Sequence, residues 1–300
     1  MRPLVGVDWG TTSLRAARLG AQGVALEERS LPRGILSVPA GGFPAVLQET
    51  CGAWLDDPST LVLVSGMAGS RQGWIEAPYC HCPAGLADIA SKLAWAEPGR
   101  VAIVPGLDCE HHGVPDVMRG EETQVVGALA LLGIASARLV LPGTHSKWVD
   151  AVNGRIERFS TFMTGEVYAL LRRHSILART MPDEDGDLDE AAFTRGVEAA
   201  LRSGSLLNAA FSARTLTLFD RLPATSMPSY LSGLVIGEEM RSQHAVQRAP
   251  EGDPVIVIGA EALTLRYEIA LRSIGGATRR VGSEATWRGL WAIAQILDAQ

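Results

Sequence analysis

One short pattern occurs twice in this chain: an apolar strand runs into a turn of glycine and hydroxyl residues, and a second strand follows. The first copy spans residues 5–19, with the turn Asp8-Trp9-Gly10-Thr11-Thr12-Ser13. The second spans residues 139–149, with the turn Gly143-Thr144-His145-Ser146. Each copy predicts a hairpin. Their recurrence predicts a duplicated architecture of two similar halves with a cleft between them.

Helical and strand patterns alternate after the first hairpin. Apolar spacing predicts helices at 43–55, 86–95 and 120–132, and apolar runs predict strands at 24–29, 61–64, 101–104, 138–141 and 254–258. Residues 167–244 are predicted to be mostly helical, and a last helix covers about 284–300. This order favours an α/β fold with a mixed sheet. With 300 residues, we expect two domains, 1–135 and 136–300, with the last helix packing back on the first.

Composition and charge narrow the class of protein. Hydrophobic residues make up 47%, charged residues 20%, and the net charge is -6, so neither a nucleic-acid nor a membrane-surface role is expected. The longest uncharged apolar stretch, residues 125–137, is too short to span a bilayer. Asp8 interrupts the apolar N-terminus, unlike a secretory signal. We therefore expect a cytoplasmic protein with reduced cysteines.

The two turns carry groups suited to phosphates. Asp8 follows a strand and could hold hydrated Mg²⁺, while Gly10 allows close backbone approach to phosphate oxygens. Thr11 and Thr12 add hydroxyl donors, and residues 143–147 repeat the arrangement. Two such turns facing each other would clamp a polyphosphate. Each turn by itself could equally be a polar hairpin turn.

Two further segments are candidates for substrate chemistry. Glu121 and Glu122 begin an apolar helix, where a carboxylate could take a hydroxyl proton during phosphoryl transfer. Acids in a first helical turn also simply favour the helix dipole. The glycine-rich loop 66–74 contains Arg71, a residue type that binds carboxylates through two hydrogen bonds. The alternative for this loop is an ordinary surface segment.

Long stretches of the chain resemble a known enzyme family. They are VGVDWGTTSLRAA, VSGMAGSRQGW, PDVMRGEETQVVGAL, LVLPGTHSKWV, FSTFMTGEVYALL, YLSGLVIGEE and VIVIGAEAL. Together they resemble the acetate and sugar kinase/Hsp70/actin superfamily and, within it, the 2-dehydro-3-deoxygalactonokinase family. The resemblance implies two ribonuclease-H-like (actin-like ATPase) domains with an interdomain cleft that closes on ATP and Mg²⁺. The first would be the substrate and first-phosphate domain, the second the nucleotide-binding domain.

The resemblance also implies a nucleotide site. The matching residues are Gly10, Thr11, Thr12, Gly143, Thr144, Ser146, Lys147, Gly259 and Ala260. Two positions depart from the superfamily pattern. Leu141 replaces an Asp that often precedes the second turn, so that turn is expected to bind phosphate without holding the metal. Ala260 replaces the usual second glycine of the adenosine motif.

The implied reaction transfers phosphate from ATP to the 6-hydroxyl of 2-dehydro-3-deoxy-D-galactonate, giving the 6-phosphate and ADP. Asp8 would orient Mg²⁺, and Glu121 would be the general base, with Glu122 as the second choice. The substrate contacts would be Ser70, Arg71, Gln72, Arg119, Glu122 and Glu166. Alternatives are the gluconate epimer or another sugar acid as substrate, a phosphatase or polyphosphatase, and a non-catalytic actin-like sensor. A homodimer is a candidate assembly that the sequence does not fix.

Two segments invite metal hypotheses that the spacing does not favour. Residues 183–194 resemble a calcium loop, but Leu188 occupies the turn-glycine position and Thr194 the position of the last glutamate. Cys80, Cys82 and Cys109, with neighbouring histidines, suggest zinc. Structural zinc sites, however, prefer two to four residues between paired cysteines. A solvated acidic loop and ordinary reduced thiols are the favoured interpretations.

Overall fold

The first Gly-Thr turn joins β1 (Leu4–Trp9) to β2 (Leu14–Leu19), and the two strands pair as an antiparallel hairpin. The hairpin belongs to a six-stranded sheet ordered β3-β2-β1-β4-β8-β7. β3 (Ala25–Leu31) pairs with β2, and β4 (Leu61–Gly66) lies parallel to β1. β8 (Val101–Ile103) and β7 (Ala94–Glu97) complete the sheet. The predicted hairpin and the strands beside it are confirmed.

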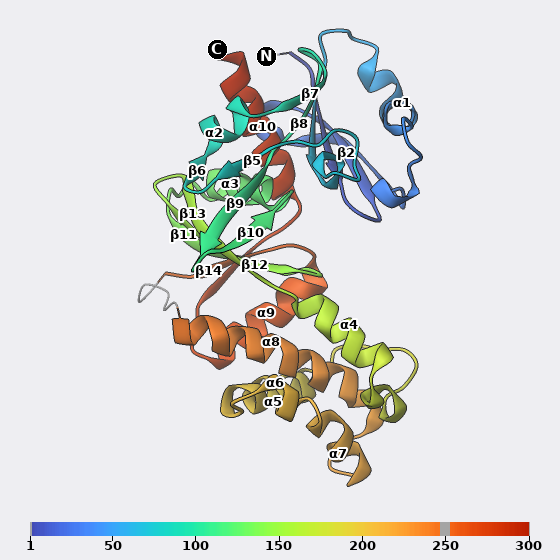
Figure 1. Cartoon of the computed structure of the whole chain (residues 1–300), viewed down its shortest axis with the longest axis vertical. Coiled ribbons are helices and arrows are strands. Elements are labelled where there is room, and N and C mark those ends of the chain that lie inside the picture. Colours follow the sequence, from blue (N-terminus) through green and yellow to red (C-terminus); the bar gives the residue numbers. More distant parts are fainter. Residues whose placement is uncertain (1, 247–252, 300) are drawn as a thin grey trace. The chain divides into compact units, whose positions relative to one another are not determined.

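The computed structural model describes residues 2–246 and 253–299, which form two compact units (Figure 1). Unit 1 contains Met1–Leu139, Val149–Ser160 and Val281–Gln300, and unit 2 contains Val140–Trp148 and Thr161–Arg280. The units interleave along the chain, which differs from the single predicted boundary between residues 135 and 136. The closing helix is α10 (Glu284–Asp298), which belongs to unit 1. Residue 300, its expected end, lies outside the described residues.

Aromatic side chains form the centre of the core in unit 1. The Trp9 ring is fully buried and lies 5.1 Å from the Phe43 ring and 6.3 Å from the Trp74 ring, between centroids. Phe43 begins α1 (Phe43–Cys51), whose apolar face is buried as its spacing predicted. Because Trp9 follows Asp8 directly, this packing fixes the end of β1 where the first turn begins.

Two helices of unit 1 cross at glycines. α3 (Glu121–Leu132) packs against α10, which is drawn in red in Figure 1. A Cβ atom at Gly127 would lie 1.8 Å from the Ala285 carbonyl oxygen, and one at Gly289 would lie 2.0 Å from the Thr123 oxygen. The two backbones therefore approach more closely than side chains would allow.

A second sheet of unit 1 was not predicted. Its order is β10-β9-β5, formed by β10 (Val114–Met118), β9 (Gly106–His111) and β5 (Tyr79–His81). The helix predicted at 86–95 was too long: α2 ends at Ser91 (Leu86–Ser91), and Ala94–Glu97 is β7. Burial in β7 alternates between half-buried and exposed residues, which suits a strand rather than a helix.

The second Gly-Thr turn also lies between two strands, β11 (Ala137–Leu141) and β12 (Ser146–Val152). They belong to a six-stranded sheet ordered β15-β14-β11-β12-β13-β6. The other strands are β15 (Thr278–Val281), β14 (Val255–Ile258), β13 (Arg155–Phe162) and β6 (Ala84–Gly85). The predicted recurrence of strand, turn and strand is therefore confirmed.

Between Thr161 and Arg280, unit 2 is mostly helical, as predicted for residues 167–244. Its helices are α4 (Thr164–His174), α5 (Glu190–Arg202), α6 (Leu206–Ala209), α7 (Ser212–Leu218), α8 (Met227–Val246) and α9 (Glu261–Ser273). α5 and α8 also cross at glycines, since a Cβ atom at Gly196 would lie 2.1 Å from the Tyr230 oxygen. Within the described residues, no helix has the length and apolar character needed to cross a membrane.

Candidate active site

The carboxylate of Asp8 lies at the end of β1, opposite Arg15 of β2 and Ser65 of β4. The Arg15 guanidinium donates to Asp8 Oδ2 at 2.5 Å. The second oxygen, Oδ1, lies beside Gly66, where a Cβ atom would be 3.5 Å from it. Gly66 has a φ of +95°, which favours glycine. One Asp8 oxygen, Oδ2, is therefore held by Arg15, and the other, Oδ1, faces the space beside Gly66 that a larger side chain would occupy.

The backbone of the first turn is braced by residues 33–37. The Gly10 amide donates to the Ser13 oxygen at 2.9 Å, closing the turn, and the Ile35 amide donates to the Gly10 oxygen at 3.0 Å. A Cβ atom on Gly34 would lie 2.2 Å from the Thr11 oxygen. The backbones are therefore in direct contact, and the side chains of Thr11 and Thr12 remain exposed.

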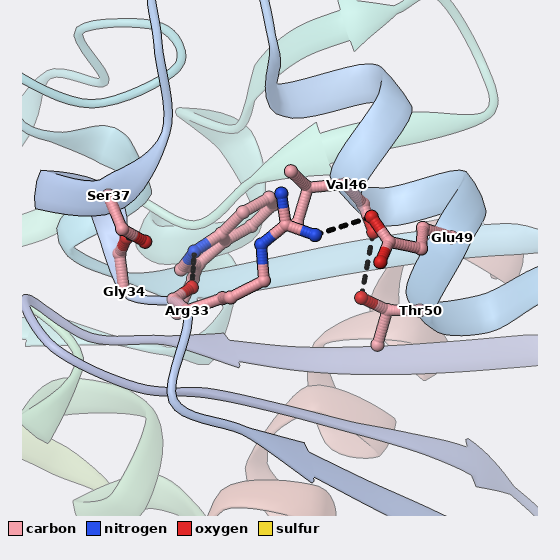
Figure 2. Close-up of polar contacts among 7 residues, drawn as sticks. Arg33, Gly34, Ser37, Val46, Glu49 and Thr50 are labelled. Atoms are coloured by element: carbon pink, nitrogen blue, oxygen red, sulfur yellow. Dashed lines mark hydrogen bonds and ion pairs between the residues drawn. The ribbon is translucent and has the colours of Figure 1, made fainter.

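Figure 2 shows how this brace is tied to α1. The Arg33 guanidinium points at Glu49 of α1 and forms an ion pair with it, and Thr50 donates to the Val46 oxygen at 2.7 Å. The Trp9 indole donates to the Arg33 oxygen at 3.0 Å. No sequence pattern singled out residues 33–37, because their contacts with the turn join positions more than 20 residues apart.

The two acids at the start of α3 occupy different environments. Glu122 is completely buried, and its carboxylate accepts hydrogen bonds from the Gly120 amide at 2.6 Å and the Thr123 hydroxyl at 3.0 Å. Glu121 is half-buried and accepts from the Arg119 amide at 3.0 Å. Of the two, only Glu121 keeps exposed surface. Glu122 instead accepts from the Gly120 amide within the core and so stabilises the N-terminus of α3.

The start of α3 is fixed against the end of β4. Gly120 has a φ of +108°, and a Cβ atom there would lie 3.2 Å from the Gly66 Cα. The Ser65 hydroxyl donates to the Thr123 hydroxyl at 2.9 Å. Since Ser65 also pairs with Asp8 across the sheet, the structure brings Asp8 and the predicted base region together within unit 1.

Burial, with the nearby charge of Glu121, raises the pKa of Glu122 to about 8. The folded protein holds this proton more tightly than the unfolded chain, whose glutamates titrate near 4.5. The free energy of unfolding should therefore fall as pH rises from about 5 to about 8. Glu122→Gln should reduce this slope by up to about 1.4 kcal/mol per pH unit. Urea unfolding between pH 5 and 8 measures the free energy of unfolding at each pH for both proteins. If Glu122→Gln shows the same pH dependence as the unchanged protein, the proposed titration of Glu122 is contradicted.

The two arginines that could bind the substrate carboxylate, Arg71 and Arg119, differ in exposure and in their hydrogen-bond partners. The Arg71 side chain is 87% exposed and pairs with Glu76 at 2.9 Å. The Arg119 guanidinium lies 4.4 Å from the Tyr79 ring centroid and donates to the Ala77 oxygen at 2.9 Å. Its Nε and Nη1 atoms are buried without a hydrogen-bond partner in the described part of the chain, as is the Ser70 hydroxyl. Buried donors of this kind are costly unless a ligand or water meets them. Gln72 is exposed.

In the second turn, Thr144 and His145 are exposed, but Ser146 and Lys147 are buried. The Lys147 ammonium donates to the Thr161 hydroxyl at 2.7 Å. The His145 ring and Glu166 lie within 2.6 Å of each other.

The second turn packs directly on the N-terminus of α4. The Glu166 amide donates to the Thr144 oxygen at 3.0 Å. A Cβ atom on Gly165 would lie 2.4 Å from the Gly143 oxygen. A helix N-terminus beside a glycine turn favours anions.

A cavity of about 260 Å³ opens beside this turn, within unit 2. It is lined by Gly143, Thr164, Gly165, Tyr168, Asp185, Ser232, Val235, Ile236, Leu263, Arg266 and Tyr267. Of these, sequence reasoning named only Gly143. Gly259 and Ala260 lie at the start of α9, which carries Leu263, Arg266 and Tyr267 into the wall. Asp185, from the loop interpreted as solvated, lines the cavity and pairs with Arg172 at 2.7 Å.

The cysteines first considered for zinc are buried thiols. Burial raises the pKa of Cys80 and raises that of Cys82 to about 12. The Cys80 thiol lies 3.6 Å from the Asp88 oxygen. Across residues 2–246 and 253–299, no three His, Cys, Asp or Glu side chains converge as metal ligands would.

Comparison with known proteins gives a consistent result. A family model for 2-keto-3-deoxy-galactonokinases matches residues 8–293. A candidate 2-dehydro-3-deoxygalactonokinase from Rhizobium meliloti (strain 1021) is 39% identical over 297 residues, which is 97% of this chain and 96% of the relative. The 2-dehydro-3-deoxygalactonokinase of Escherichia coli (strain K12) is 36% identical over 297 residues, covering 98% of both chains.

Solved structures agree at the level of fold. The crystal structure of a candidate 2-dehydro-3-deoxygalactonokinase from Sinorhizobium meliloti has a TM-score of 0.90 at 38% identity, covering 98% of this chain and 99% of the other. Component A of the (R)-2-hydroxyglutaryl-CoA dehydratase of Acidaminococcus fermentans has a TM-score of 0.55 at 11% identity, covering 99% and 100%. The chain therefore has the mixed α/β, actin-like ATPase fold that its motifs led us to expect.

Proposed function

Because the chain belongs to the 2-keto-3-deoxy-galactonokinase family, we propose that it transfers the γ-phosphoryl group of ATP to the 6-hydroxyl of 2-dehydro-3-deoxy-D-galactonate. The products are the 6-phosphate and ADP. The observation that carries this proposal is the family match from residue 8 to residue 293, which includes both Gly-Thr turns. A cytoplasmic location follows from a reaction that consumes ATP, and a homodimer remains the proposed assembly.

The proposal divides the work between residues 1–135 and 136–300. The second part binds the nucleotide: the cavity of about 260 Å³ takes the adenosine, and Gly143 with Thr144 contacts phosphates. Ser146 and Lys147, which are buried behind the turn, hold its backbone in place. The first part supplies Gly10, Thr11 and Thr12 to the phosphates and binds the sugar acid. Both turns present backbone amides and hydroxyls, which are donors for phosphate oxygens.

Glu121 is the proposed general base. Its carboxylate takes the proton from the 6-hydroxyl while the hydroxyl oxygen bonds to the γ-phosphorus and the bond to the ADP oxygen breaks. The hydrogen bond from the Arg119 amide fixes one of its oxygens. Glu122 is proposed to support this helix start rather than to touch the substrate, because its carboxylate is completely buried.

Asp8 is proposed to hold hydrated Mg²⁺. The residues fit the ion: a carboxylate is a preferred Mg²⁺ ligand or water acceptor, and Gly66 leaves a cradle beside Oδ1 that a side chain would fill. When bound, the ion would neutralise charge on the phosphates. Arg15, bonded to Oδ2, keeps the carboxylate oriented.

Arg119 is the proposed anchor for the substrate carboxylate, because its buried Nε and Nη1 lack protein partners among the described residues. The buried Ser70 hydroxyl, also without a described partner, would donate to a substrate oxygen. Arg71 is the alternative anchor for the carboxylate, and it is the weaker candidate because its exposed side chain already pairs with Glu76. Gln72 and Glu166 remain proposed contacts to the hydroxyl groups.

Gly34→Ala should lower kcat/KM for ATP by roughly 10–100-fold, because the added methyl would collide with the Thr11 backbone and displace the first turn. Steady-state kinetics with ATP as the varied substrate measures the effect. Gly204→Ala is the control, since a Cβ atom there meets no atom within 4 Å. Unchanged kinetics in Gly34→Ala would show that residues 33–37 do not set the geometry of the turn.

A coupled ADP-release assay across 2-keto-3-deoxy sugar acids tests the proposed function. We expect ADP release that depends on the sugar acid and is fastest with the galactonate form. Faster turnover of the gluconate epimer would change the substrate assignment. Phosphate release from ATP or polyphosphate without a sugar acid would indicate a phosphatase, and binding without turnover would indicate a sensor.

A further inference from the structure

One buried carboxylate of unit 2 takes no part in the proposed phosphoryl transfer. Glu239 lies in α8 and is 2% exposed. Its Oε1 accepts hydrogen bonds from the Ser146 hydroxyl at 2.9 Å and the Trp148 indole at 2.6 Å. Its Oε2 accepts from the Tyr267 hydroxyl at 2.8 Å and from the Thr164 hydroxyl. A carboxylate this deep is tolerated only when such donors compensate for its lost hydration.

Two of the four donors line the cavity, and the other two belong to the strand that follows the second Gly-Thr turn. Ser146 and Trp148 begin β12, directly after the second Gly-Thr turn. Thr164 is the first residue of α4, and its neighbour Gly165 packs on the Gly143 backbone. Tyr267 comes from α9, and both Thr164 and Tyr267 line the cavity. One side chain therefore connects the turn, the helix N-terminus beside it and a wall of the cavity.

We propose that Glu239 is a positioning residue for the nucleotide: it holds the second Gly-Thr turn, the start of α4 and Tyr267 in the single arrangement that the phosphates and adenosine require. The inference rests on the proposed function, because it assumes that this cavity binds ATP. Glu239 itself touches no nucleotide in this scheme, since its carboxylate lies behind the residues that line the cavity.

The chemistry of the donors explains why a carboxylate is needed. The Trp148 indole can only donate, whereas the hydroxyls of Thr164 and Tyr267 can donate or accept. A glutamine at position 239 would therefore direct its oxygen to Trp148 and its amide group to the two hydroxyls. The Thr164 and Tyr267 hydroxyls would then have to accept from position 239 and direct their own hydrogens elsewhere. Glu239→Gln preserves size but disturbs the side of the network that lines the cavity.

Steady-state kinetics and calorimetric ATP binding on the full chain test this. Glu239→Gln should raise KM and Kd for ATP by about 10-fold, as expected when only about one tenth of the molecules keep the arrangement that binds ATP. The kcat value and the KM for the sugar acid should stay within about threefold of the unchanged protein. Glu238→Gln is the matched control. Glu238 is the preceding residue of α8, pairs with Arg241 at 2.5 Å and is absent from the cavity wall, so its ATP binding should not change.

Tyr267→Phe removes a single donor from Glu239 and should raise KM for ATP in the same direction, which carries the test if Glu239→Gln does not fold. Two results would overturn the inference. One is an unchanged KM for ATP in both variants, and the other is a lowered Tm with unaltered ATP binding, as a purely structural role would give. If the unchanged protein fails to bind ATP at all, the proposed function itself is refuted.

Discussion

Replacing Glu121 with Gln should lower kcat by at least about 100-fold while ATP binds with nearly unchanged affinity. Glutamine has almost the same shape as glutamate and can keep the hydrogen bond from the Arg119 amide, but it cannot accept the proton of the 6-hydroxyl. The loss should therefore fall on the chemical step. Steady-state kinetics gives kcat, and calorimetry gives the affinity for ATP.

Glu122→Gln is the matched comparison, because Glu122 is adjacent in sequence but completely buried. Its kcat should fall far less than that of Glu121→Gln. The reverse order, with normal turnover in Glu121→Gln and a large loss in Glu122→Gln, would assign the base to Glu122. Normal turnover in both variants would remove the general base from α3 altogether.

Arg119→Ala should raise KM for the sugar acid by about 10–100-fold, since a hydrogen bond to a charged group is worth about 1.5–3 kcal/mol. The KM for ATP should remain nearly constant. The reason is the two buried guanidinium nitrogens that lack a partner among the described residues, which a substrate carboxylate would satisfy. Varying each substrate in turn separates the two KM values.

Arg71→Ala is the control for that experiment, because its side chain is 87% exposed and already paired with Glu76. We expect a KM within about threefold of the unchanged protein, as is usual for an exposed ion pair. Arg119→Lys separates charge from shape, since lysine keeps the charge but cannot form two parallel hydrogen bonds. A larger effect of Arg71→Ala than of Arg119→Ala would place the carboxylate at Arg71.

Sequence reasoning succeeded where the necessary residues are neighbours in the chain. Both Gly-Thr turns consist of a strand, a glycine and hydroxyl residues in direct succession, so local rules describe them. The helix that begins at Glu121 was found for the same reason, from its apolar spacing and its acidic first turn.

The supporting contacts could not be found this way because they join distant positions. Ser65 reaches Thr123 across 58 residues, and Glu239 reaches Ser146 across 93. Neither pair produces a periodic pattern. The β9–β10 hairpin was missed for a different reason: Asp108, Glu110 and Asp116 interrupt its apolar alternation. Its turn contains His112 and Gly113, both with positive φ. The charged residues on either side hide the alternation that would mark this turn as part of a hairpin.

The order in which the chain is synthesised matters for the proposed base. Glu121 begins α3, and α3 packs at Gly127 against Gly289 of α10, a helix that begins 163 residues after Glu121. A nascent chain can assemble helices α4 to α9 of unit 2 from the single stretch Thr161–Arg280. The scaffold that aims Glu121 must wait for one of the last segments to leave the ribosome.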